Sequence, residues 1–246
     1  VSTYAKINFE PISLLNIYAD VQYRYVGYST SGMDADKNTY NASRNWHFIQ
    51  PKAGVIVKVK PEHQLYVSYA LGNREPNRDD VLSAYFSNKE AKHETMHNVE
   101  AGYKWLNNSF PLQINYYMMQ YNNQLVLTGR LNDVGNPIKE NVKTSYRTGV
   151  ELSGAIHVKR NSNRHDKWLE KRVFSVGYSF TYSINKIASF NEFIYTFDDN
   201  YSPIDSLTEI VNHKNVNISY SPSFVGGLEL TGYPLKGLEI SLINKA

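Results

Sequence analysis

The sequence predicts an all-β chain that forms part of an antiparallel transmembrane β-barrel. Three observations predict this fold class. Apolar and polar side chains alternate at period two over unusually long stretches, the connections between these stretches alternate between short and long, and tyrosine is frequent, with 20 Tyr against 10 Phe and 3 Trp in 246 residues. No apolar run reaches about 18 residues, so the sequence contains no membrane-spanning helix.

The composition limits the function classes. The chain has no Cys, which excludes disulfides and cysteine-ligated metals, and its formal net charge of +3 is too small to indicate nucleic acid. An excess of Tyr suits surfaces that are apolar along the ring and wet at the hydroxyl, as at membrane interfaces and recognition sites. A soluble β-protein with half-buried Tyr is the alternative, because Tyr is also a good strand former.

The alternation defines the strands in order. In the stretch from Leu15 to Tyr25, one face carries Leu15, Ile17, Ala19, Val21, Tyr23 and Tyr25, and the other carries Asn16, Tyr18, Asp20, Gln22 and Arg24. We expect about ten such strands, at residues 3–10, 15–28, 47–60, 64–72, 96–106, 112–128, 146–158, 173–187, 223–233 and 238–246. Several exceed ten residues, whereas soluble strands usually have about five or six and a tilted membrane-crossing strand needs about 9–11.

The connections alternate strictly in length. The short connections cover residues 11–14, 61–63, 107–111, 159–172 and 234–237, and the long ones cover 29–46, 73–95, 129–145 and 188–222. Transmembrane β-barrels have short periplasmic turns and long extracellular loops. A soluble sandwich has no reason to keep this order, so the connections favour a barrel wall.

The polar faces are expected to point into the barrel. The inward-pointing charged residues would be Lys6, Asp20, Arg24, Lys58, Glu100, Lys104, Glu151 and Glu229. An interior this polar must be wet or filled by another polar domain. The solvated face of an ordinary antiparallel sheet alternates in the same way, so no single residue separates the two cases.

The string HETMH, residues 93–97, matches the H-E-x-x-H signature of zinc hydrolases. A zinc site of this type needs His93 and His97 one turn apart on a helix. The following residues alternate as a strand, and positions four apart on a strand are separated by about 13 Å, too far for two nitrogens that each lie about 2 Å from one zinc. A helical turn at residues 87–92 is the only support for the hydrolase, and we expect a chance match where a loop enters a strand.

The other candidate sites are weak. The turn at residues 159–172 carries six Lys or Arg but lacks the interleaved aromatic residues that nucleic-acid binding needs. The Asp-rich segments 78–80 and 197–200 lack EF-hand spacing and fit ordinary turns. No phosphate-binding Gly-rich loop and no Ser-His-Asp order is present. We therefore expect no enzyme, no cofactor, no metal site and no nucleic-acid partner.

Specific strings add a resemblance to this physical argument. In order along the chain they are QPKAGVIVKV, LYVSYALGNREPNRDD, HETMHNVEAGYKW, YYMMQYNNQLVLTGRLNDVGNPIKENV and SYRTGVEL. The set resembles the barrel of TonB-dependent receptors, most closely the variants of Bacteroidetes-type bacteria, and it is most specific over residues 51–152. In that family a strand opens near a Glu and continues as N-x-E-x-G-Y-K, which matches Glu94 and residues 98–104, so Glu94 has an explanation without metal.

The resemblance implies a 22-stranded barrel of the bacterial outer membrane, in contact with lipid and lipopolysaccharide. We expect residues 1–246 to be a fragment of this single barrel domain, because both ends resemble strands in progress and Ala246 is not the usual terminal aromatic residue. An N-terminal plug domain and the last strands would lie outside the fragment. In such receptors the TonB complex acts on the plug and drives import.

The loop after residue 72 is the expected ligand-facing segment. Its candidate residues are Arg74, Glu75, Asn77, Arg78, Asp79 and Asp80, with Tyr85 and Phe86 further along. Tyr offers a large contact area with little rotamer entropy to lose. The alternative is a structural anchor, in which Arg74 pairs with Glu75 and Pro76 defines the turn.

The leading functional hypothesis is active import of a scarce, bulky nutrient such as a ferric siderophore, haem, cobalamin or a glycan. A passive outer-membrane porin or an adhesin without a plug is the second hypothesis. A zinc hydrolase is a further alternative, which requires a metal-bound helix at residues 88–100. A soluble β-sandwich module is another, which requires folding in water without detergent. The identity of the ligand does not follow from the sequence, because unrelated ligands use one scaffold.

Overall fold

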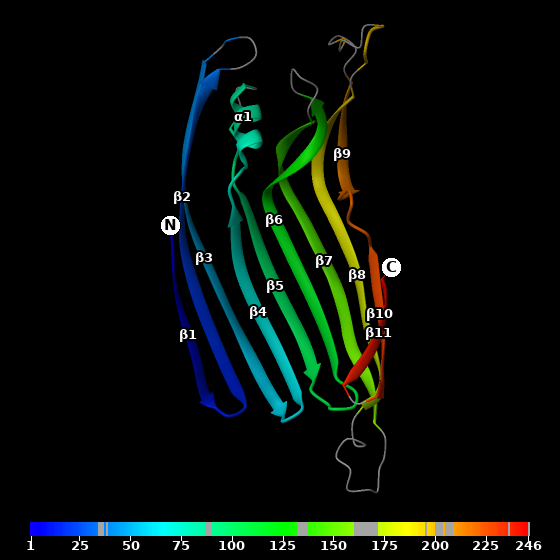
Figure 1. Cartoon of the computed structure of the whole chain (residues 1–246). Helices are drawn as coiled ribbons and strands as arrows, with labels where there is room; N and C mark the ends of the chain where they lie inside the picture. Colours follow the sequence, from blue (N-terminus) through cyan, green and yellow to red (C-terminus); the bar gives the residue numbers. More distant parts are fainter. Residues whose placement is uncertain are drawn as a thin grey trace, which may run out of the picture.

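The computed structural model describes the whole chain except residues 34–36, 38, 87–89, 132–136, 160–171, 195, 200–203, 205–208, 236 and 246. The described residues form one curved antiparallel sheet with a short helix on its concave side (Figure 1). The elements are β1 (Ser2–Ile12), β2 (Leu15–Met33), β3 (Thr39–Lys60), β4 (His63–Arg74), α1 (Arg78–Phe86), β5 (Glu94–Trp105), β6 (Leu112–Leu131), β7 (Pro137–Lys159), β8 (Arg172–Ile194), β9 (Glu209–Asn217), β10 (Phe224–Leu235) and β11 (Leu238–Lys245). The helix is too short to cross a membrane.

From β1 to β8, each strand pairs antiparallel with the next strand along the chain. At β8 the order changes, because two strands share its free edge. The upper half of β8 pairs with β9, with Lys186 opposite Asn217, and its lower half pairs with β10, with Tyr182 opposite Phe224. Strands β9 and β10 are thus two parts of one interrupted strand along β8. The segment 218–223, which connects them, bulges out of the sheet.

The structure has 11 strands where the sequence predicts about ten. The additional strand is β9, which lies inside the segment 188–222 that was predicted as a long loop. It pairs only with the upper end of β8, and its other edge has no partner strand among the described residues. Its sequence lacks the alternation on which the strand prediction depends.

Two further predicted loops are mostly strand. The segments 29–46 and 129–145 extend the β2–β3 and β6–β7 hairpins, with pairs such as Met33 with Thr39 and Leu131 with Pro137. On β3 the exposed side chains of Asn41, Ser43 and Asn45 are polar, so the alternation disappears there although backbone pairing continues. At the opposite rim the described short turns agree with the prediction, as between Ile12 and Leu15, whereas the predicted turn at 159–172 lies almost wholly outside the described residues.

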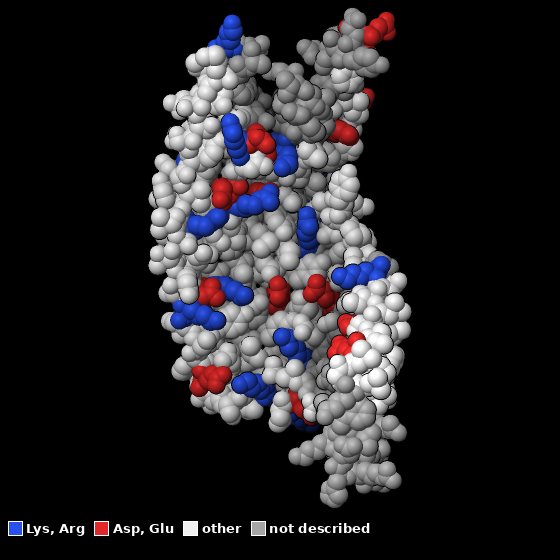
Figure 2. Space-filling view, in the orientation of Figure 1, with Lys and Arg blue, Asp and Glu red and all other residues white. Residues whose placement is uncertain are grey.

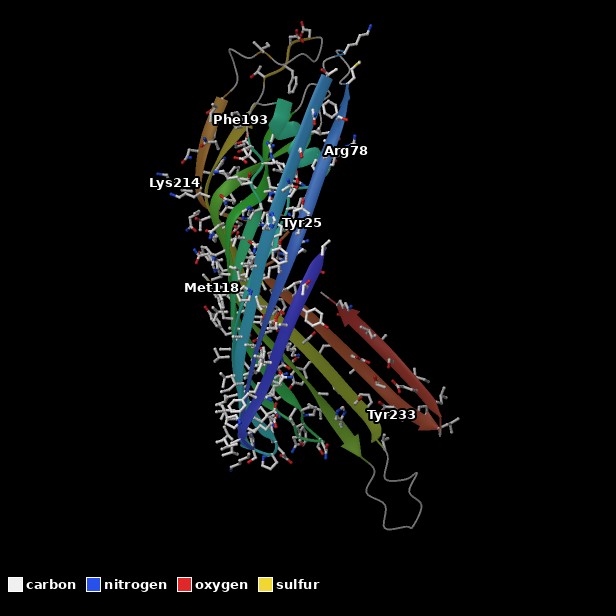
Figure 3. All side chains as sticks on the ribbon, turned by 90° about the vertical axis from the view of Figure 1, so that its left-hand side faces the viewer. Tyr25, Arg78, Met118, Phe193, Lys214 and Tyr233 are labelled. Carbon is white, nitrogen blue, oxygen red and sulfur yellow. The ribbon has the colours of Figure 1, made fainter. Side chains whose placement is uncertain are left out.

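The two faces of the sheet differ as predicted. Large apolar side chains on the convex face are exposed, including Ile49 (62%) and Val67 (56%), and Met118 points away from the concave side (Figure 3). On the concave face Lys6 of β1 lies opposite Asp20 of β2. Gln64 of β4 lies between Lys58 of β3 and Lys104 of β5. Figure 2 shows Lys, Arg, Asp and Glu spread over this concave face. The predicted inward direction of the charged residues is confirmed.

Candidate functional site

The described part of the segment between β4 and β5, residues 75–86 and 90–93, folds inward over the concave face, and we call it the inward loop (Figure 1). Its helix α1 begins with a reciprocal cap. The Asp80 N–H donates to Asn77 Oδ1 at 2.8 Å, and the Asn77 N–H donates to Asp80 Oδ2 at 3.2 Å. The acidic residues Asp79 and Asp80 in the first turn also suit the positive end of the helix dipole.

A small hydrophobic cluster holds α1 against the sheet. Val81 is buried with Ala42, Trp46 and Phe48 of β3. Most large apolar residues of this chain face outward, so these buried side chains form a local core rather than the core of a globular domain. Burying one Val side chain contributes about 1.5–3 kcal/mol, enough to dock a nine-residue helix only together with other contacts.

Arg24 of β2 supplies the first of these contacts. Its guanidinium binds both carboxylate oxygens of Glu75, at 2.6 and 3.2 Å, and donates to the Asn73 carbonyl at 3.1 Å. The same group lies 5.0 Å above the Phe48 ring. Both side chains of the pair are less than a third exposed. The start of the inward loop is therefore tied to β2.

Beside the inward loop, Glu94 at the start of β5 is held by Arg74 of β4 and by Leu125 of β6, and the loop itself is tied to β7. Arg74 Nε binds Glu94 at 2.6 Å, and the buried Glu94 carboxylate also accepts the Leu125 N–H at 2.6 Å. Lys139 of β7 lies 3.8 Å from Asp80. The Lys92 backbone exchanges two hydrogen bonds with the Asn141 side chain, at 2.9 and 3.0 Å. The loop thus bridges the concave face from β2 to β7.

The structure divides the predicted ligand-facing residues into two groups. Arg74, Glu75, Asn77 and Asp80 are engaged in the intrachain contacts described above. The alternative, a structural anchor, agrees with these contacts, but its Arg74–Glu75 pair is wrong, because each residue pairs with a different partner from another strand. Arg78 and Asp79 are exposed, and they are the described candidates on the open side of α1. The side chains of Tyr85 and Phe86 lie outside the described residues.

The HETMH string forms no metal site. Strand β5 begins at Glu94, so no helix carries the two histidines. The His93 ring packs on Phe48 of the concave face, at 5.3 Å between centroids, whereas His97 Nδ1 bonds the Tyr69 hydroxyl on the convex face at 2.9 Å. The two imidazoles lie on opposite sides of the sheet. Within the described ranges, no group of three or more His, Asp or Glu is arranged to hold a metal.

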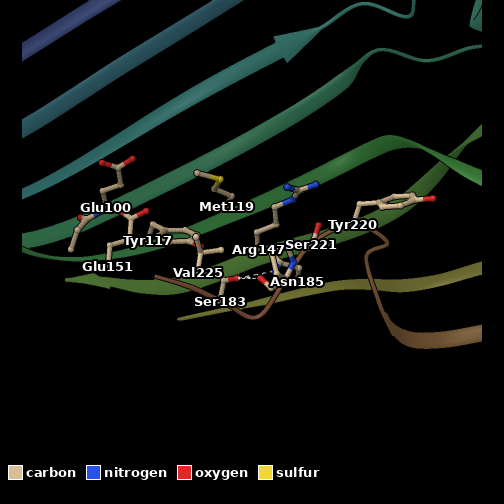
Figure 4. Close-up of a pocket in the computed structure, with 12 residues that line it drawn as sticks. Glu100, Tyr117, Met119, Arg147, Glu151, Ser183, Asn185, Tyr220, Ser221 and Val225 are labelled. Atoms are coloured by element: carbon tan, nitrogen blue, oxygen red, sulfur yellow. Dashed lines mark hydrogen bonds between the residues drawn. The ribbon is translucent and has the colours of Figure 1, made fainter. Parts of the chain in front are cut away.

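An open pocket of about 350 Å³ lies lower on the concave face (Figure 4). The strand interruption at 218–223 forms one wall, with Tyr220 fully exposed at its tip in a left-handed backbone conformation, φ 56°. Ser183 supports this wall by donating to the Pro222 carbonyl at 3.0 Å. The sequence prediction missed this site, although the Ser-Pro at 221–222 is a turn signal inside a strand.

Two carboxylates, Glu100 and Glu151, line the same end of the pocket (Figure 4). Asn115 orients Glu151 by donating to it at 3.1 Å, and the Tyr66 hydroxyl in turn donates to Asn115 at 2.9 Å. Among the residues that the structure describes, neither carboxylate has a Lys or Arg within ion-pair distance. Arg147 also lines the pocket, so its charged lining is two carboxylates and one guanidinium.

The Tyr66 ring owes its position to Gly102, which stands opposite it on β5. A Cβ at Gly102 would collide with the ring, so we expect Gly102→Val to displace Tyr66 and break its bond to Asn115. Overpacking of this kind costs about 1–3 kcal/mol. The midpoint of thermal unfolding of the full-length protein should fall. Gly232→Val is the matched control, because nothing lies within 4 Å of a Cβ there, and an equal fall in both variants would contradict the expectation.

Comparison with known families gives a decisive match. The model of the TonB dependent receptor-like β-barrel matches residues 4–242, nearly the whole chain. The chain belongs to the TonB-dependent receptor family. Barrels of this family lie in the bacterial outer membrane, so the convex face of this receptor section meets lipid, and its members are transporters rather than enzymes.

Solved receptors have the same fold. The chain matches the siderophore receptor PiuA of Acinetobacter baumannii with TM-score 0.67 and 17% identity, over 98% of this chain and 32% of that one. The ferric yersiniabactin uptake receptor FyuA of Yersinia pestis gives 0.62 and 14%, over 94% and 30%. The hemophore receptor HasR of Serratia marcescens gives 0.61 and 15%, over 99% and 44%.

The TonB-dependent receptor section thus spans less than half the length of each of these proteins. At such identities the likeness concerns the fold alone. No curated protein matches the sequence closely enough to count as a relative.

Proposed function

We propose that residues 1–246 are a fragment of a single, 22-stranded transmembrane β-barrel domain, completed in the full-length protein by further strands and filled by an N-terminal plug. Two features support this arrangement. The sheet has two open edges, β1 and β11, and exposed edges of this length favour aggregation unless they are paired. The chain also spans 32% of the PiuA receptor. The strings quoted for the resemblance favour the Bacteroidetes type.

The proposed function is active uptake of a scarce, bulky nutrient through the outer membrane. The observation that carries it is the polar concave face. Glu100, Glu151 and Arg147 line a pocket there, and neither carboxylate forms an ion pair among the described residues. An interior of this polarity is either wet or filled. A plug would supply polar partners and close the lumen, so that transport needs work from the TonB complex.

The nutrient is proposed from the related structures and from the loop. The similar receptors are named for a siderophore, for ferric yersiniabactin and for a hemophore with heme, which supports an iron chelate or haem. Cobalamin and glycans remain in the proposed class. Arg78 and Asp79, together with Tyr85 and Phe86, are the residues that we propose to contact it. The structurally engaged Arg74, Glu75, Asn77 and Asp80 would position them.

Uptake by whole cells tests the proposed function. Cells that carry the full-length receptor should accumulate one of four labelled probes, a ferric catechol chelate, haem, cyanocobalamin or an oligosaccharide, above its external concentration. Accumulation should stop when TonB is deleted or the proton gradient is collapsed, because the energy source is then lost. Accumulation that persists without TonB would contradict the proposal.

A passive porin or an adhesin is the second candidate, and the same cells distinguish it. A porin would let a small labelled sugar equilibrate across the outer membrane at a rate that TonB deletion does not change. An adhesin would bind its target with no uptake at all.

A further inference from the structure

Tyrosine and histidine side chains pair across neighbouring strands on the convex face. In each pair the phenol oxygen lies within hydrogen-bond distance of imidazole Nδ1. The pairs are Tyr23 with His47 at 2.7 Å, Tyr69 with His97 at 2.9 Å, and Tyr103 with His63 at 2.6 Å. The ring centroids are 6.1, 6.2 and 6.0 Å apart. We call these the Tyr–His pairs.

The hydrogen bond determines which imidazole nitrogen carries the proton. In the tautomer in which Tyr donates to Nδ1, the proton of the ring resides on Nε2. No described residue bonds to Nε2 of His47, His97 or His63. Each pair therefore presents an N–H donor that the protein itself does not use.

Two of the pairs lie where the convex face changes from apolar to polar. On β3, Ile49 below His47 is 62% exposed, whereas Asn45 and Ser43 continue the same face above it. On β5, Val99 below His97 is 41% exposed, and Thr95 follows above. In a membrane barrel this change marks the boundary between acyl chains and headgroups.

The third pair lies at the opposite boundary. His63 stacks on Trp105 at 5.9 Å, beside the short turn after β5. From His97 to Trp105 the strand advances eight residues, or about 26 Å at 3.3 Å per residue. With strands tilted by about 35–45°, this length rises about 20 Å along the membrane normal, somewhat less than the apolar band of about 25 Å on outer-membrane barrels. The outward side chains of β4 between them are apolar, including Leu65 (48%) and Val67 (56%).

We propose that the Tyr–His pairs bind the phosphate groups of membrane lipids, with His47 and His97 at the extracellular boundary and His63 at the periplasmic one. Lipid phosphate is the acceptor that this position offers, and hydrogen bonds to a charged oxygen are about twice as strong as neutral ones. The proposal rests on the membrane location of the family but not on transport.

Lipid retention by the full-length protein tests the proposal. The protein is purified in dodecyl maltoside, mixed with phosphatidylglycerol or with a galactolipid that lacks phosphate, and the lipids that remain bound are counted by native mass spectrometry. The unmodified protein should prefer phosphatidylglycerol. His47→Phe with His97→Phe should reduce this preference about tenfold per histidine, which corresponds to one lost hydrogen bond to a charged group.

A second variant separates hydrogen bonding from packing. His47→Gln with His97→Gln keeps an N–H donor near the position of Nε2 but packs less well than Phe, so it should retain most of the preference. His213→Phe is the matched control, because His213 bonds Glu192 at 2.6 Å on β9, above the apolar band. This control should leave lipid retention unchanged.

Two results would overturn the proposal. Equal retention of phosphatidylglycerol by the Phe variant and the unmodified protein would show that the imidazoles do not bind it. Loss of the preference on addition of inorganic phosphate to the detergent would assign the pairs to free phosphate instead of lipid. Neither result depends on uptake, so a failure here differs from a failure of the proposed transport function.

Discussion

Replacing Arg24 with Met should make trypsin cut the full-length protein within the inward loop about thirtyfold faster. Arg24 makes three hydrogen bonds to Glu75 and Asn73, and Met keeps the length of the stem but none of the donors. The loss of hydrogen bonds to a charged partner costs about 2 kcal/mol. The population of the open loop, and with it the cleavage rate after the exposed Arg78, rises by the corresponding factor.

The matched control for this prediction is Lys58→Met. Lys58 also pairs across strands, with Glu10 at 3.7 Å, but both side chains are 40% or more exposed. Exposed pairs contribute only about 0–1 kcal/mol, and this one lies far from the inward loop. Cleavage after Arg78 should not change in the control. Equal cleavage rates in the Arg24 variant and the unmodified protein would show that other contacts alone hold the loop closed.

Replacing Glu94 with Ala should lower the midpoint of thermal unfolding by an amount that corresponds to about 2 kcal/mol. The substitution leaves the Leu125 N–H without its acceptor, and an unsatisfied buried donor costs about 1–3 kcal/mol. It also removes the partner of Arg74, but that side chain is 69% exposed and water can hydrate it. The expected loss of unfolding free energy is therefore smaller than the 3–5 kcal/mol that follows when one partner of a fully buried ion pair is removed.

Two comparisons sharpen this prediction. Glu94→Gln keeps an oxygen for the Leu125 N–H and should lose about half as much, whereas Glu10→Gln, at an exposed turn, should change little. The measurement is repeated with a zinc chelator. Because His93 and His97 lie on opposite faces, the chelator should change no midpoint. A fall on chelation in the unmodified protein that disappears in the Ala variant would restore the metal hypothesis.

Much of the membrane-crossing part of the fold was predictable. The strands crossing the membrane, the inward direction of Lys6 and Glu151, and the short turns agree with the structure. Acyl chains form no hydrogen bonds, so the outward side chains there are mostly apolar, and this preference repeats at every second residue. Outside the membrane this preference ends. Strand β9 and the extensions to Met33 and Ile194 were therefore missed.

The contacts of the candidate site were not predictable. Arg74 and Glu75 are neighbours in sequence, which made a local pair plausible, but adjacent residues of an extended chain point to opposite faces of the strand. Glu75 instead binds Arg24, 51 residues away, and Arg74 binds Glu94. The helix α1 was also missed, because only Val81 and its neighbours on β3 hold so short a segment.

The sequence by itself determined the fold class, the two faces of the sheet and the family, because each depends on a pattern that recurs along the chain or on strings that it contains. Only the tertiary structure decided which way the loop after β4 folds, which carboxylates are paired and where the Tyr–His pairs lie. These features depend on the register between strands, and the register brings together residues such as Tyr23 and His47 whose spacing in the sequence carries no signal.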